Sequence, residues 1–240
     1  MIRTVRWFVL LAIIAIAVIQ GKAWSDRHPQ DLPWTTLRLD DPVGRYTASR
    51  IAALGDQPGQ CRALLAAAGT RDRVAPPRKP SADCGFDDGM ILAGGSARRS
   101  GFAPAGLVTS CPVATALLLW DERVVQPAAR RHFGTGVSAL SHAGSFSCRR
   151  LYGRQAGAWS EHATGDAVDI LGFRLADGRT VSVLRDWPRV GQEAAFLRDV
   201  RNGACLLFTT VLSPDYNAAH RDHLHLDTAD RGPGGWRACR

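Results

Sequence analysis

The sequence predicts an α+β fold in which helices come first and a small, mainly antiparallel sheet carrying a single zinc site follows. Apolar residues recur at helical spacing in most of the chain before residue 134. After that point, short apolar runs of strand length dominate, with one further helix among them. Asp177-Gly178 joins two of these runs and is a typical antiparallel hairpin turn. Helices and strands that are segregated along the chain in this way indicate the α+β class.

Three helices are expected before the sheet, at residues 47–54, 58–68 and 112–132. Pro58 suits a first helical turn, and Gly69 and Gly134 are suited to end the second and third helices. The third helix carries the strongest apolar spacing, through Val113, Ala116, Leu117, Trp120, Val124 and Ala128. Residues 70–87 contain three prolines and are expected to form a loop.

The expected strands are short and apolar, and they lie at residues 137–140, 167–173, 180–184 and 205–212. A helix at residues 192–202, ended by Gly203, is expected between the last two strands. Residues 45–240 are therefore expected to form one domain.

The N-terminus predicts export. Arg3 and Arg6 precede an apolar run at residues 7–19, which has the length of a signal-peptide core and is short for a membrane span. Small residues allow cleavage after Ala23, so residues 1–23 form a signal peptide or an uncleaved membrane anchor. Residues 24–44 are polar and rich in proline and are expected to be an extended lead-in.

The net charge indicates the class of partner, and the cysteines indicate the cellular compartment. The net charge of +8 favours a polyanionic partner such as the cell wall. Scattered arginines without aromatic interleaving argue against nucleic acid. The cysteines are even in number and contain no C-x-x-C pair, so we expect up to three disulfides outside the cytoplasm. Six cysteines allow fifteen pairings, among which the sequence does not choose; our prediction is sequential pairing, with Cys205–Cys239 holding the end of the chain. The six cysteines are Cys61, Cys84, Cys111, Cys148, Cys205 and Cys239.

Two short segments hold four of the seven histidines. In the second segment, residues 220–227, a strand would direct His223, His225 and Asp227 to one face and the two leucines to a core. In the first segment, a helix would separate His162 from Asp169 by about 10 Å, too far to share a metal ion, so a loop returning into a strand is expected. Imidazoles and one carboxylate, with a fourth position open, are typical of catalytic zinc.

These motifs resemble a known group of enzymes. Ser160-x-His162-x-x-Gly165-x-Ala167-x-Asp169 followed by His223-x-His225 resembles the D-Ala-D-Ala metallopeptidases, which share a fold with the Hedgehog domain, and most closely the penicillin-insensitive murein endopeptidases. Residues 33–240 resemble the bacterial extensin-like protein C-terminal domain family. The resemblance is carried by Pro33-Trp34, Cys61, Cys84-Gly85, Cys111-Pro112-Val113-Ala114, Trp120, Ser147-Cys148-Arg149 and Cys239-Arg240.

The resemblance implies that His162, Asp169 and His225 hold zinc and that His223 is catalytic, with His220 beside it. It also implies that Arg149 binds a substrate carboxylate or a developing oxyanion. The glutamate base of related carboxypeptidases is absent, because Asp222 precedes His225 by three residues. We therefore expect an imidazole base, His223 first and His220 second.

The expected function is that of a monomeric, extracytoplasmic or periplasmic zinc peptidase acting on peptidoglycan, as an endopeptidase or a carboxypeptidase. Two alternatives remain open. One is a zinc-containing wall-binding protein without catalysis, which would bind zinc but release no product from sacculi. The other is a hydrolase of a substrate outside the wall. Contact with a membrane is expected only through an uncleaved N-terminal anchor.

Overall fold

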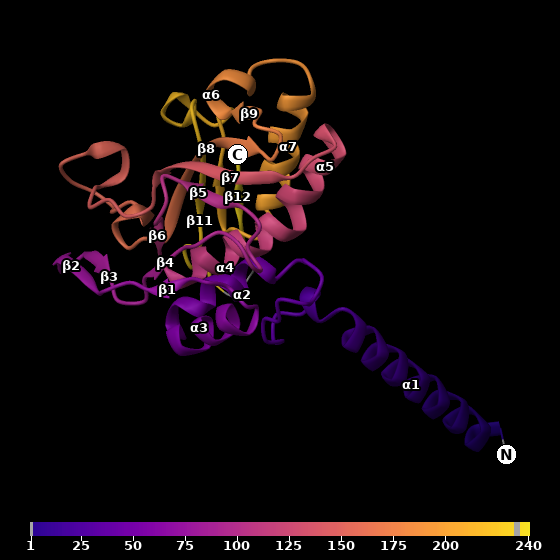
Figure 1. Cartoon of the computed structure of the whole chain (residues 1–240). Coiled ribbons are helices and arrows are strands. Elements are labelled where there is room, and N and C mark those ends of the chain that lie inside the picture. Colours follow the sequence, from indigo (N-terminus) through magenta and orange to yellow (C-terminus); the bar gives the residue numbers. More distant parts are fainter. Residues whose placement is uncertain (1, 233–235) are drawn as a thin grey trace.

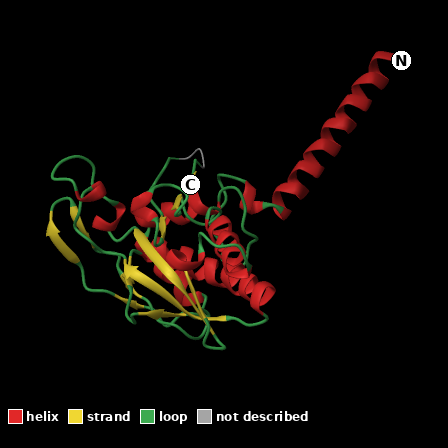
Figure 2. Cartoon of the chain, turned by 90° about the horizontal axis from the view of Figure 1, so that it is seen from above, coloured by secondary structure: helices red, strands yellow, loops and turns green. Residues whose placement is uncertain are grey.

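The computed structural model describes residues 2–232 and 236–240. The chain is a mixed α+β domain, with helices packed on one face of a seven-stranded sheet (Figures 1 and 2). The first helix, α1 (Ile2–Arg27), stands apart from this domain and has no buried residue. Among the described residues, α1 is the helix long and apolar enough to cross a membrane, and a signal sequence has the same properties.

The lead-in to the domain is more ordered than expected. Helix α1 continues four residues beyond Ala23, and the short helix η1 (Pro29–Asp31) follows it almost at once. Leu32 and Leu37 are then buried. The backbone also joins the domain, because the amide of Tyr46 donates to the carbonyl of Gln30. Residues 29–46 are therefore packed on the domain instead of extending freely.

The first two predicted helices are present as α2 (Thr47–Ala52) with η2 (Ala53–Asp56), and as α3 (Pro58–Ala67). The loop expected at residues 70–87 instead contains the short strands β1 (Arg73–Val74), β2 (Arg78–Ser81) and β3 (Cys84–Phe86). Pro80 is compatible with β2 because this strand pairs on one side only, with β3. Strand β1 pairs with β4 (Met90–Ile91), which pairs with β6 (Val108–Thr109).

The long predicted helix is present in three parts that follow one another directly: α4 (Cys111–Trp120), the π-helical turn η3 (Asp121–Val125) and α5 (Gln126–Phe133). Gly134 ends it in the left-handed conformation, with φ of 71°. The later helix, α7 (Gln192–Ala204), passes through Gly203 and does not end there. A Cβ at Gly203 would lie 2.3 Å from a methyl carbon of Val124, so this glycine permits close packing on η3.

The sheet has the strand order β12-β10-β11-β8-β7-β5, and β9 pairs with β8 outside this path. Its pairs are antiparallel except β10 with β12 and β5 with β7. The strands are β5 (Gly101–Ala103), β7 (Val137–Gly144), β8 (Ala167–Leu175), β9 (Thr180–Ser182), β10 (Thr210–Leu212), β11 (Leu224–Asp227) and β12 (Ala238–Cys239). The prediction of a mainly antiparallel sheet agrees with this pairing.

Two predicted strands are longer than the real ones. Only Thr210–Leu212 of the run at residues 205–212 is a strand, because Leu207 and Phe208 enter the core from the turns after α7. The run at residues 180–184 also stops early: Ser182 caps α6 (Val183–Asp186) by accepting a hydrogen bond from the amide of Arg185. Buried apolar residues occur in the strands and in the helix and turns beside them, so apolar character does not distinguish the two.

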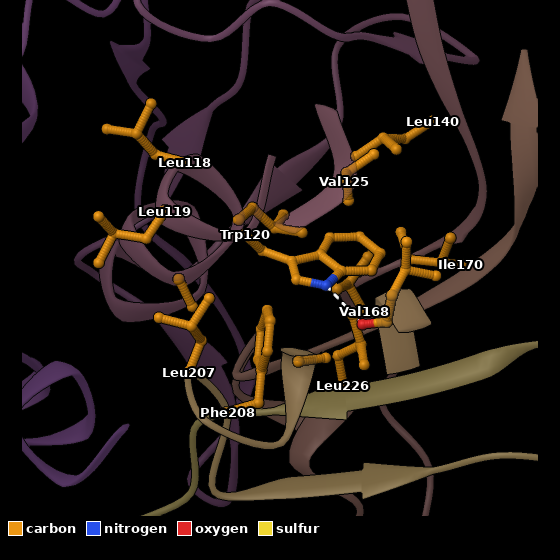
Figure 3. Packing of buried hydrophobic residues seen from close by; sticks show 14 of the residues in the cluster. Leu118, Leu119, Trp120, Val125, Leu140, Val168, Ile170, Leu207, Phe208 and Leu226 are labelled. Carbon is orange, nitrogen blue, oxygen red and sulfur yellow. Dashed lines mark hydrogen bonds between the residues drawn. The ribbon is translucent and has the colours of Figure 1, made fainter. Parts of the chain in front are cut away.

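The core lies between the helices and one face of the sheet (Figure 3). The Trp120 ring packs beside Phe173 and Phe208, and its indole N–H donates to the carbonyl of Val200 at 2.9 Å. Val168 and Ile170 of β8 point to this side, as does Leu226 of β11. Strand alternation therefore sends the intervening residues of β8 and β11 to the opposite face.

Three disulfides join the six cysteines, as expected in number, but two of the expected pairs are wrong. The pairs are Cys61–Cys111, Cys84–Cys148 and Cys205–Cys239, and only the last follows the sequential pattern. Packing of α3 against α4 places the Cα atoms of Cys61 and Cys111 6.1 Å apart. The pairing thus follows contacts between elements and not proximity along the chain.

Candidate metal centre

Asp169 and His225 meet because their strands are adjacent. Strands β8 and β11 are antiparallel, and their register places Asp169 directly opposite His225. Their neighbours along each strand, Ile170 and Leu224 among them, face the core. The two polar side chains therefore project together from the other face of the sheet.

His162 reaches the same point from a turn. It lies in the 3₁₀ helix η5 (Glu161–Ala163), where the Ser160 side chain caps the helix by accepting from the amide of His162. Gly165 then has φ of 75°, a left-handed conformation that lets the chain reverse into β8. His162 and Asp169 are thereby brought together by a loop entering a strand.

The three side chains could hold one metal ion. One ligand atom from each of His162, Asp169 and His225 lies within 4.8 Å of the others. His162 Nε2 is 3.2 Å from Asp169 Oδ1, and His225 Nδ1 is 3.0 Å from the same oxygen. The two imidazole nitrogens are 3.2 Å apart. Two nitrogens and one carboxylate oxygen form a donor set that zinc commonly accepts.

Each imidazole is oriented by its other nitrogen. His162 Nδ1 donates to the carbonyl oxygen of Ser145 at 2.6 Å, which directs Nε2 toward Asp169. His225 Nε2 lies 3.3 Å from Asp227 Oδ2, leaving Nδ1 for the shared point. Metal-binding histidines almost always have such a carbonyl or carboxylate partner. The residues around the three side chains therefore fit a metal site.

The electrostatics of the site favour a cation. Burial opposes ionisation of Asp169, but hydrogen bonds from His162 and His225 outweigh it and hold the pKa of this carboxyl well below its usual range. Burial likewise opposes charge on His225, yet Asp169 and Asp227 raise its pKa to about 9. The buried carboxylates therefore stabilise positive charge at this point, whether it comes from a proton or from a metal ion.

Two more histidines lie beside the three. His223 Nδ1 is bonded to Asp222 Oδ1 at 2.8 Å, and its Nε2 lies 3.5 Å from Asp169 Oδ1. His220 packs its ring 5.3 Å from that of His223, and its Nδ1 donates to Asn217. Burial, followed by the nearby charge of His223 and His225, lowers the pKa of His220 to about 4. His220 is therefore neutral at neutral pH and a weak base, whereas His223 directs Nε2 toward the site.

Arg149 and Glu161 complete the surroundings. Arg149 is half-exposed, and its Nη2 lies 3.8 Å from Asp169 Oδ2. Burial, and then the charge of Asp227, raises the pKa of Glu161. Both side chains face the same cleft as the histidines.

The site opens into a cleft of about 750 Å³, within the usual size range of ligand pockets. Its walls combine arginines and aromatic rings with the histidines. Besides the side chains already described, they include Leu151, Tyr152, Trp159, Thr210, Leu212, Tyr216, Arg231, Trp236, Arg237, Ala238, Cys239 and Arg240.

The predicted site residues thus lie together: His162, Asp169 and His225 at one point, with His220, His223 and Arg149 around it. Sequence reasoning missed the backbone carbonyl of Ser145, which carries no side-chain signal. It also missed the contribution of residues 236–240, because their place in the cleft depends on the pairing of β12 with β10.

Comparison with known proteins gives one match. The family model described as Extensin-like protein C-terminus matches residues 59–240. No curated protein and no solved structure matches. The resemblance to D-Ala-D-Ala metallopeptidases rests on the residue motif, and neither comparison supports it.

Proposed function

The chain belongs to the Extensin-like protein C-terminus family, and from this starting point we infer that it is an exported zinc-dependent peptidase acting on peptidoglycan stem peptides or cross-links. The observation that carries the proposal is the convergence of His162, Asp169 and His225 within 4.8 Å in a cleft lined by further histidines. A structural zinc site is closed by four protein ligands, whereas this group offers three.

Export is supported by two independent features. The apolar helix α1 lies at the N-terminus, and three disulfides join all six cysteines. Disulfides persist in oxidising compartments and are rare in the cytosol. We therefore place the domain outside the cytoplasm, either released or held by α1, where cell-wall peptides are accessible.

The roles of the residues follow from their positions. His162, Asp169 and His225 would hold zinc, which when bound supplies a Lewis acid that polarises a carbonyl and acidifies water. His223 would accept the proton of the attacking water at Nε2, because Asp222 holds its Nδ1–H. It would then return that proton to the leaving amine. Arg149, beside Asp169, would stabilise negative charge on the substrate.

Digestion of sacculi tests this function. Purified protein with one equivalent of zinc should release peptide fragments that mass spectrometry assigns to specific bond cleavage. Chelation should stop the release, and added zinc should restore it. Stoichiometric zinc without any product would instead indicate a wall-binding protein, and product from a non-peptide bond would indicate another hydrolase.

A further inference from the structure

The cleft continues from the candidate metal centre to the edge of the sheet. Strand β10 contributes Thr210 and Leu212 to its lining, and the segment after residue 235 contributes Trp236 through Arg240. Strand β12 within that segment is the outermost strand on this side. One wall of the cleft is therefore built by residues that play no part in the proposed chemistry.

The register places Arg240 in line with the metal centre. Asp169 is opposite His225, which is opposite Leu212. Val211 pairs with Cys239 in a parallel arrangement, so the next residue, Arg240, comes beside Leu212. At about 4.8 Å per strand, two spacings separate His225 from Arg240, or roughly 10 Å.

The backbone at this position is fixed. The amide of Arg240 donates to Val211, and its carbonyl oxygen accepts from both the amide and the hydroxyl of Ser213 at 2.9 and 2.8 Å. The Cys205–Cys239 disulfide holds the preceding residue. The side chain of Arg240 is thus anchored at its base while remaining exposed in the cleft.

The guanidinium of Arg240 is close enough to Tyr216 to influence it electrostatically and is not paired with a carboxylate of the described residues. Within residues 2–232 and 236–240 it makes no hydrogen bond and no ion pair. Two acidic side chains line the cleft, and no ion pair joins either of them to Arg240. Asp227 lies 3.3 Å from His225 Nε2 and 3.7 Å from Arg231, and Glu161 comes from η5. Trp236, which is 60 % exposed, adds an aromatic surface to the same wall.

We propose that Arg240 binds an acidic group of the substrate and so determines its specificity. This inference rests on the proposed peptidase function and adds a second recognition point to it. The substrate is therefore a peptide with a free carboxylate away from the bond that is cut, toward the β12 edge of the cleft. Arg240 touches this carboxylate and not the reacting atoms.

Binding measurements on the whole chain, treated with a chelator to prevent turnover, test the proposal. The probes are muropeptides from sacculi and the same muropeptides with their carboxylates converted to amides. Wild-type protein should bind the acidic form about tenfold more tightly, as expected for a charge-assisted hydrogen bond. Arg240→Gln should remove this preference, and Arg240→Lys should keep most of it. Arg130→Gln, on the exposed end of α5 outside the cleft, is the matched control and should bind like the wild type.

Equal affinity of wild type and Arg240→Gln for the acidic muropeptides would overturn the subsite. A loss of affinity in Arg240→Gln that is equally large for the acidic and the amidated muropeptides would overturn it as well. Product release is measured separately with zinc present. If Arg240 mediates binding but the loaded protein releases no product, the subsite stands and the peptidase function fails. If product is released but the affinity does not depend on Arg240, the peptidase function stands and the subsite fails.

Discussion

Asp169 Oδ1 and His225 Nδ1 lie 3.0 Å apart on directly opposed residues of two antiparallel strands. Because the sheet fixes both backbones, this contact does not depend on a flexible loop. The same oxygen is 3.2 Å from His162 Nε2, so Asp169 is the centre of the group.

Removing any of the three ligands should remove the metal. His162→Ala, Asp169→Ala and His225→Ala should each leave less than one tenth of the zinc retained by the wild type, because each removes one of the three ligands proposed for the metal. His223→Ala should retain zinc. Metal analysis after gel filtration measures this, with circular dichroism to show that each variant is folded. Loss of zinc from His223→Ala together with its retention by His225→Ala would show that the two roles are reversed.

Substitution of His223 should remove turnover without removing the metal. His223→Ala should lower kcat/KM on cross-linked muropeptides by about 10²–10⁴-fold, the usual contribution of a general base. His220→Ala should have a smaller effect, because burial lowers the pKa of His220 to about 4 and makes it a weak base. The wild-type rate should fall on the acid side with an apparent pKa of roughly 6 to 7.

Zinc occupancy has to be measured at each pH, since protonation of a ligand histidine also releases the metal. Rates within about threefold of wild type for both histidine variants would exclude an imidazole base. Asp222 or Glu161 would then be the base, or the protein is not a peptidase.

The metal-free protein should lose stability in alkali. The pKa of His225 is raised from 6.5 to about 9 in the folded state, so its contribution to the free energy of unfolding is complete below pH 6.5 and lost as the pH rises through about 9. The contribution of Asp169, whose pKa is lowered from 3.8, is present above that pH and lost on acidification. Urea unfolding in chelator at several pH values measures both limbs.

Asp169→Asn is the control, because it removes the main partner of His225 and should flatten the alkaline limb. The affinity for zinc should rise with pH below pH 9, whereas the stability of the metal-free protein falls. Zinc binding displaces one proton from His225, so the apparent affinity should rise about tenfold per pH unit. An alkaline limb of equal size in Asp169→Asn would assign the effect to other groups.

Two helical glycines should respond oppositely to substitution. Gly203→Ala should lower the free energy of unfolding by about 1–3 kcal/mol, because its Cβ would lie 2.3 Å from a methyl carbon of Val124. Gly59→Ala, in α3, has no atom within 4 Å of the new Cβ and should leave stability unchanged or raise it by up to about 1 kcal/mol. Thermal unfolding of the two variants beside the wild type is the measurement. Equal effects would contradict the close packing of α7 on η3.

The native protein should contain no free thiol. Thiol labelling of protein taken from outside the cytoplasm should find none, and peptide mapping without reductant should recover Cys61–Cys111, Cys84–Cys148 and Cys205–Cys239. Recovery of Cys61 linked to Cys84 would instead support the sequential pairing.

Local patterns predicted the parts of the site that depend on strand alternation and on turns. The leucines of β11 indicated which face carried His225, and Gly165 indicated the reversal between His162 and Asp169. Long-range contacts were not accessible in this way. The partner of Cys61 depends on how α3 packs on α4, and the place of Arg240 depends on a parallel pair between β10 and β12.

Residues 29–46 pack against the domain, so a single residue, His28, separates them from α1. One residue spans less than about 4 Å, which leaves the domain no tether. A form that keeps α1 in a membrane would hold the domain at the membrane surface. A form released after Ala23 could diffuse away from the membrane. Whether α1 is cut therefore decides how far from the membrane this protein can act.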